Sequence, residues 1–187
     1  GPDLTGLMAK AASFYKEQLK GSERAIAYLK KRGLSGAIAA RFGLGYAPAQ
    51  ATALKQVFAD YEAPELAAAG LVIDGERGRY DRFRDRIMFP IRNVKGDVIG
   101  FGARVIDRGE PKYLNSPETP LFHKGRELYG LYEARQSLRT LDRLLVVEGY
   151  VDVVRLAQAG ILYGVATLGT ATTPEHLNRL FRLTSEV

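Results

Sequence analysis

The chain has 187 residues, of which 46% are hydrophobic and 26% charged, a balance that supports a buried core and argues against disorder. It contains no cysteine, which excludes disulfides and thiolate metal sites, and no apolar run of about 18 residues that would predict a membrane span. The net charge of +6 favours an anionic partner, and without a secretory signal the cytosol is the expected compartment.

Helical patterns dominate the first third of the chain. Gly1-Pro2 resembles the remnant of a cleaved tag, so we exclude these two residues from the fold prediction. Apolar residues then recur near helical spacing from Leu4 to about Ala69. Ser22 and Ser35 are predicted to cap two helices. The stretch GLGYAP interrupts the helical pattern, AQATALKQVFADY resumes it, and a last short helix is predicted at residues 64–69.

The pattern changes after Gly70. Short β-favouring runs separated by Asp-Gly, Arg-Gly and Lys-Gly turn signals predict an antiparallel meander. Residues 108–125, RGEPKYLNSPETPLFHKG, are too rich in Pro, Gly, Asn and Ser for regular structure, and they predict a binding loop.

From Leu128 onward, helices and strands alternate. Helices are predicted in LYGLYEARQSLRT, YVDVVRLAQAG and TTPEHLNRLFRL, the last capped by Thr173, with strands in RLLVVEG and ILYGVATLG between them. Alternation with short connections predicts a parallel α/β unit. We therefore expect helices plus an antiparallel sheet, followed by an α/β part.

The positive charge is concentrated in one segment. Residues 77–126 hold twelve Lys or Arg against six Asp or Glu, an excess equal to the net charge of the whole chain. If the stretch YDRFRDRIMFP is a strand, Arg82, Arg84 and Arg86 share one face, either as a row of phosphate contacts or as a solvated surface. Aromatic residues interleave with these charges, a mixture that single-stranded nucleic acid binders use, and we favour nucleic acid.

Glu148 follows a strand that is too apolar to face solvent. Open α/β sheets place their ligand crevices at this position, where a carboxylate can bind Mg²⁺, act as an acid or base, or simply cap the next helix. Asp152 can face the same crevice or only the helix N-terminus, and Gly149 can admit a close backbone approach or only close a turn. The two histidines, His123 and His176, are far apart and do not predict a zinc site.

Six stretches, RFRDRIMFPI, GDVIGFGAR, PKYLNSPETPLFHKG, LYGLYEA, LLVVEGYVDVV and LGTATTPEH, occur in this order and spacing. Together they resemble the RNA polymerase domain of bacterial DnaG-type primases. The resemblance implies an α+β amino-terminal subdomain at residues 3–122 with a basic ridge, followed by an α/β Toprim fold at residues 123–187. It also implies synthesis of short RNA primers from ribonucleoside triphosphates on a single-stranded DNA template, with Mg²⁺ or Mn²⁺, at the replication fork.

The resemblance also assigns roles to residues. Glu148 matches the first acid of the Toprim signature, as a metal ligand or acid/base group, Gly149 matches its companion glycine, and Asp152 has a secondary place. The residues that match those holding template, primer or nucleotide phosphates are Arg82, Arg84, Arg104, Lys112, Tyr113 and Lys124. Family members carry zinc in a separate module, and they contact the replicative helicase and single-strand-binding protein through other regions.

Two departures from the family pattern change these expectations. Ala103 stands where the family usually has glycine, so we expect an ordinary φ at this position. The Asp-x-Asp pair that completes Toprim metal sites does not occur in this sequence, whose last stretch, FRLTSEV, stands where the strand carrying that pair is expected to begin. Glu148 is therefore the only metal ligand expected. We therefore expect an incomplete Toprim fold with an exposed sheet edge, and a chain that binds ligands but is catalytically silent.

Two alternatives stay open. The chain can act only as a platform for single-stranded nucleic acid or nucleotide phosphates. It can also belong to another Toprim enzyme, a topoisomerase or a nuclease, although PKYLNSPET is expected in neither.

Overall fold

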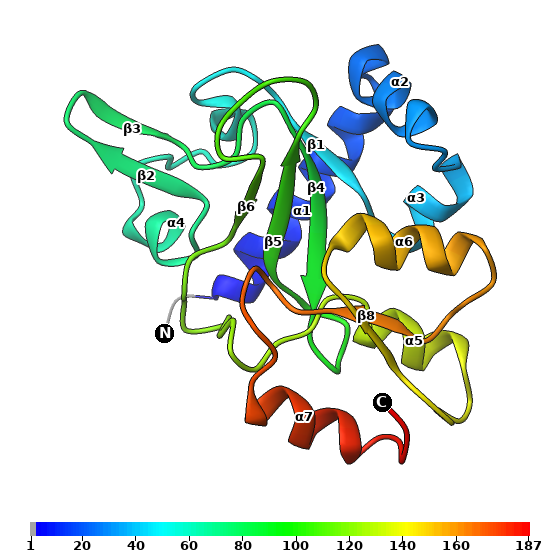
Figure 1. Cartoon of the computed structure of the whole chain (residues 1–187). Helices are drawn as coiled ribbons and strands as arrows, with labels where there is room; N and C mark the ends of the chain where they lie inside the picture. Colours follow the sequence, from blue (N-terminus) through cyan, green and yellow to red (C-terminus); the bar gives the residue numbers. More distant parts are fainter. Residues whose placement is uncertain (1–2) are drawn as a thin grey trace.

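The first three helices follow the predicted punctuation. The computed structural model describes residues 3–187 (Figure 1), so the expectation for residues 1–2 lies outside the described part. The helices are α1 (Leu4–Lys20), α2 (Glu23–Lys31) and α3 (Gly36–Phe42). The hydroxyls of Ser22 and Ser35 each accept a backbone N–H three residues further on, which confirms both N-caps.

In the next segment the predicted interruption of the helical pattern at GLGYAP is confirmed, whereas the predicted return to a helix after it is wrong. GLGYAP contains a strand, β1 (Gly45–Ala47), and AQATALKQVFADY forms only the 3-10 turn η1 (Ala53–Gln56) before helix α4 (Pro64–Ala68). The physical reason is long-range pairing. β1 bonds to a distant strand, while the backbone near η1 is bonded to Asp81: its carboxylate accepts Leu54 N–H at 3.1 Å. Those bonds replace the intrahelical ones.

The predicted antiparallel strands form two sheets. A hairpin of β2 (Val72–Gly75) and β3 (Gly78–Asp81) stands apart from a four-stranded sheet with the order β1-β4-β5-β6. The new strands of the larger sheet are β4 (Arg86–Arg92), β5 (Val98–Val105) and β6 (Tyr113–Asn115). β6 lies inside the stretch predicted as an irregular loop, because its three residues pair with β5.

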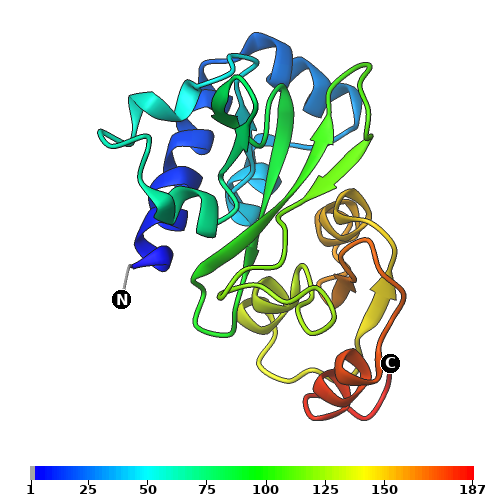
Figure 2. The ribbon, with the colours of Figure 1, turned by 90° about the vertical axis from the view of Figure 1, so that its left-hand side faces the viewer.

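Both faces of the four-stranded sheet are buried. One face packs against α1, and the other packs against α2, α3 and the carboxyl-terminal part (Figure 2). Alternate β4 residues divide between these cores: Phe89 belongs to one and Met88 to the other. Pro90 is tolerated in β4 because β1 pairs only as far as Met88, so no second partner needs its missing N–H.

The carboxyl-terminal part is the predicted α/β unit. Strands β7 and β8 pair in parallel, which confirms that prediction. Leu145 at the start of β7 is 41% exposed, so the expectation that this strand is too apolar to face solvent is wrong there. The elements are α5 (Leu131–Ser137), β7 (Leu145–Val147), α6 (Tyr150–Gln158), β8 (Gly164–Ala166) and α7 (Pro174–Phe181).

A continuous core joins the two parts. The Phe89 ring of β4 lies 5.3 Å from the Tyr150 ring of α6 and 6.1 Å from the Tyr129 ring, measured between centroids. The boundary near residue 122 therefore stays a prediction, since the core runs across it. Among residues 3–187, no helix combines the length and apolar character needed to cross a membrane.

Candidate functional site

The arginines of YDRFRDRIMFP do not share a strand face. β3 ends before Arg82 and β4 begins at Arg86, so the residues between them turn from one sheet to the other. Asp85 in this turn has φ of 51°. The row of Arg82, Arg84 and Arg86 is therefore a wrong prediction, because period-2 alternation holds only within one strand.

These arginines have separate surroundings. The Arg82 guanidinium donates to the Asn115 carbonyl at 2.8 Å, and that of Arg86 donates to the Pro111 carbonyl at 2.6 Å. Both therefore support the chain around β6, and burial lowers their pKa values. Arg84 is exposed, with its Cζ 5.0 Å from the centroid of the Tyr80 ring. Of the three, Arg84 is the one open to a ligand.

Arg104 is held between two tyrosines. Its Cζ lies 5.3 Å from the Tyr28 ring centroid and 5.6 Å from that of Tyr113. Arg104 is only 5% exposed, whereas Tyr113 is 45% exposed. The Lys112 ammonium lies 5.8 Å from the Tyr113 centroid. The fold thus places two of the predicted residues, Arg104 and Tyr113, in a Tyr28–Arg104–Tyr113 stack, with the predicted Lys112 beside it. Arg104 supports the exposed Tyr113 ring.

A cavity of about 620 Å³ lies beside this stack. We call it the cationic cavity. Its charged lining residues are Arg24, Lys31, Arg32, Arg104, Asp107 and Arg155. Arg24 is already paired, since it bonds Asp107 at 2.8 Å and Asp85 at 2.9 Å. Those hydrogen bonds from Arg24 hold the pKa of Asp85 below its usual range. The other cations leave a net positive hollow between α2, β5 and α6.

The acids of EGYVD lie at the start of α6. Glu148 is exposed directly after β7, and Asp152 is exposed in the first turn of the helix. Gly149 has φ of −128°, which any residue adopts, and a Cβ there would lie 3.3 Å from Asp152 Oδ2. In the described range 3–187, no group of three or more His, Cys, Asp or Glu side chains could hold a metal ion.

Tyr150 connects these acids to the stack. Its ring lies 6.2 Å from that of Tyr113 in an edge-to-face arrangement, and it stacks on Phe89. Burial raises the pKa of Tyr150 far above its ordinary value. The start of α6 is therefore fixed against the sheet that carries the predicted phosphate residues.

Comparison with known proteins decides the family. A model described as the DNA primase catalytic core, N-terminal domain, matches residues 14–135. The chain belongs to the DNA primase catalytic core family. A Toprim domain model matches residues 142–187. Because the first match ends before the Toprim match begins, it is independent of the Toprim match and favours primase over another Toprim enzyme.

Relatives of the primase core extend over nearly the whole chain. DNA primases of Neisseria meningitidis and Pseudomonas aeruginosa are 60% and 55% identical, over 91% and 98% of this chain. The chain spans 29% of the length of each of these curated relatives. A solved DnaG primase catalytic domain bound to ssDNA matches with a TM-score of 0.93 and 51% identity, covering 98% of this chain and 61% of that one.

Several charged residues of this primase core escaped the sequence prediction. Lys31, Arg32 and Arg155 line the cationic cavity but lie in or beside helices, where Lys-Lys-Arg is typical of an ordinary helix end.

The expectation for Ala103 is confirmed, because Asp85 is the only non-glycine residue with positive φ in the described part. Lys124 lies in the loop between β6 and α5, apart from the stack.

Proposed function

We propose that this chain binds single-stranded DNA as the template-holding part of a primase core. The observation that supports the proposal is the cationic cavity beside the exposed Tyr113 ring. Lysine and arginine side chains neutralise phosphates, and an exposed aromatic ring stacks on unpaired bases. Arg104 lines the cavity and contacts the Tyr113 ring, so the two features adjoin, and together they suit a single strand better than a protein surface that merely carries excess charge.

In the complete protein, the activity proposed is synthesis of RNA primers from ribonucleoside triphosphates on this template. We assign Lys31 and its neighbours in the cationic cavity to template phosphates. Arg84, Lys112 and Lys124 are assigned to template, primer or triphosphate oxygens, with Arg82 and Arg104 supporting the surface. Helicase and single-strand-binding protein are proposed partners of the complete protein, at the bacterial replication fork in the cytoplasm.

The divalent metal expected of the family has only part of its site here. Glu148 and Asp152 offer two exposed carboxylates, and no larger cluster occurs within residues 3–187. Mg²⁺ needs near-octahedral oxygen coordination and is bound by one or two carboxylates together with waters and substrate phosphates, so these two side chains alone give at most weak binding of the ion. The described residues therefore do not fit a complete metal site, and we propose ligand binding without nucleotidyl transfer for this chain.

Replacing Lys31 with alanine should weaken binding of labelled single-stranded DNA and flatten its salt dependence. Removing one phosphate interaction with a single strand reduces the slope of log K against log salt by about 0.7. Lys30→Ala is a matched control, because Lys30 neighbours Lys31 on α2 but lines a separate hollow between α1, α2 and α3. Fluorescence anisotropy at several salt concentrations measures both quantities. Equal effects of the two substitutions would show that the cavity is not the binding site.

Tyr113→Ala should weaken the same binding by about 1–3 kcal/mol without changing the salt slope, because a stacking contact releases no counterions. Phe181→Ala serves as the comparison, since Phe181 is an exposed aromatic residue at the end of α7 that contacts none of the assigned cations. A loss of salt dependence in Tyr113→Ala would instead mean that the ring acts only by holding Lys112 and Arg104.

A further inference from the structure

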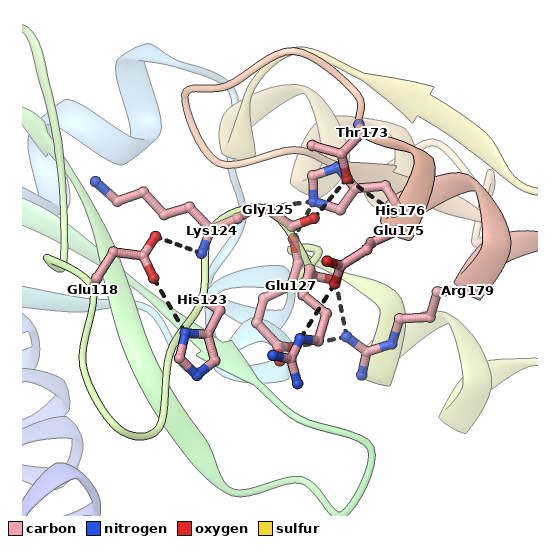
Figure 3. Close-up of polar contacts among 10 residues, drawn as sticks. Glu118, His123, Lys124, Gly125, Glu127, Thr173, Glu175, His176 and Arg179 are labelled. Atoms are coloured by element: carbon pink, nitrogen blue, oxygen red, sulfur yellow. Dashed lines mark hydrogen bonds and ion pairs between the residues drawn. The ribbon is translucent and has the colours of Figure 1, made fainter.

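Four successive backbone carbonyls are bound by side chains of the α7 region. The Thr173 hydroxyl donates to the Gly125 carbonyl at 2.6 Å, and the Arg179 guanidinium donates to that of Arg126 at 3.0 Å (Figure 3). The His176 Nε2 lies 3.0 Å from the carbonyl oxygen of Lys124 and 3.2 Å from that of Glu127. We call Thr173, His176 and Arg179 the carbonyl clamp.

The hydrogen bonds assign the tautomer of His176. Its Nδ1 accepts the Thr173 backbone N–H at 3.0 Å, so Nδ1 carries no proton. Nε2 is then the protonated nitrogen and donates to the two carbonyls. His176 is 0% exposed, so water does not replace these bonds. The ring is a neutral connector between the N-terminus of α7 and the loop that contains Lys124.

Arg179 completes the attachment from the next turn of α7. It also bonds the Glu127 carboxylate at 3.1 Å, and both side chains of this ion pair are mostly buried. The Lys124 backbone is held on its other side as well, because its N–H donates to Glu118 Oε1 at 3.0 Å. The main chain of Lys124 therefore has both its donor and its acceptor engaged.

The Lys124 side chain is placed differently from its backbone. In the part of the chain that the structure describes, its ammonium makes no ion pair or hydrogen bond, and Figure 3 shows it extending away from the clamp. A fixed backbone that carries a free ammonium is preorganised for an anion, because less ordering remains to be done on binding.

We propose that the carbonyl clamp positions Lys124 to bind a phosphate group. This inference rests on the proposed function, and the phosphate can belong to a single-stranded template or to a nucleoside triphosphate. The three clamp residues are positioning residues, since they contact the loop and not the ligand.

Two substitutions distinguish the two functions of His176, its bonds to the loop carbonyls and its bond in the N-cap of α7. Asparagine places its oxygen near the position of Nδ1, so His176→Asn keeps the bond from Thr173 N–H but removes the donor to the loop carbonyls. Glutamine places its amide nitrogen near the position of Nε2, so His176→Gln keeps the donor to the loop. His176→Asn should weaken phosphate binding roughly three- to tenfold, whereas His176→Gln should largely preserve it.

The readouts are anisotropy with labelled single-stranded DNA and calorimetry with ATP, each for the parent chain, both His176 variants, Lys124→Ala and the Lys124→Ala/His176→Asn double variant. If Lys124→Ala and His176→Asn weaken only the binding of DNA, the phosphate bound by Lys124 belongs to the template. If they weaken only the binding of ATP, it belongs to the nucleoside triphosphate. The double variant should bind no more weakly than Lys124→Ala alone, because the clamp acts through that side chain.

The outcomes distinguish the two proposals. An additional loss in the double variant means that the clamp only stabilises the fold, and it overturns the inference. Binding that Lys31→Ala weakens, while Lys124→Ala and His176→Asn leave it unchanged, overturns the clamp and retains the proposed template site. Failure of the parent chain to bind either DNA or ATP contradicts both.

Discussion

Replacing Glu133 with glutamine is expected to stabilise the protein by about 3 kcal/mol at pH 8 and by almost nothing near pH 4. Glu133 lies in the first turn of α5 and is 7% exposed, and within residues 3–187 neither of its carboxylate oxygens has a hydrogen-bond partner. Burial raises the pKa of this carboxyl to about 7, although the charges of Arg92 and Arg41 oppose the shift. Glutamine has nearly the same shape and no charge to desolvate.

The direction in which the stability of the parent changes with pH follows from proton binding by Glu133. The unfolded chain releases the Glu133 proton near its ordinary pKa of 4.5, and the folded protein releases it near 7. Between these values the folded state binds more protons, so the stability of the parent falls as pH rises and then levels off above pH 7. The advantage of Glu133→Gln should grow over the same interval.

Urea unfolding followed by circular dichroism at pH 5, 6, 7 and 8 measures this difference, since the chain has no tryptophan to report by fluorescence. Glu76→Gln is the control, because Glu76 is an exposed acid in the turn between β2 and β3. If the free energy of unfolding of Glu133→Gln exceeds that of the parent by the same amount at every pH, Arg92 neutralises the carboxylate in the folded protein.

Gly102→Ala is expected to destabilise the protein by about 1–3 kcal/mol through steric overlap with Tyr150. A Cβ built on Gly102 would lie 2.5 Å from Tyr150 Cε2 and 2.7 Å from Cε1. The ring cannot move aside easily, because it is 4% exposed and packs against Phe89 and Tyr129. Since Tyr150 begins α6, the substitution should also displace Glu148 from its place beside the sheet.

Thermal and urea unfolding of Gly102→Ala, Gly36→Ala and the Gly102→Ala/Tyr150→Leu double variant separate sterics from backbone effects. Among the described residues, a Cβ at Gly36 has no neighbour within 4 Å, so Gly36→Ala should be neutral or stabilising. In a Tyr150→Leu background, the cost of Gly102→Ala should largely disappear. An undiminished cost in that background would place the strain in the strand and not at the ring.

Local signals in the sequence were sufficient for much of this fold. Ser22, Ser35 and Thr173 cap helices as predicted, because a cap depends on residues within one turn of it. The alternation of strand and helix after Leu128 likewise predicted the parallel pair β7 and β8. The motif strings predicted the primase family, since their order along the chain needs no coordinates.

Tertiary structure alone decided the candidate site. β1 and β6 exist because they pair with β4 and β5, partners that local propensity does not reveal. The arginines near residue 84 face different surroundings because the chain changes sheets there, and the cationic cavity collects charges from α2, β5 and α6. The carboxyl-terminal His176 holds the Lys124 carbonyl across 52 positions of sequence. Contacts of this kind depend on where distant segments meet, and periodicity along one segment carries no such information.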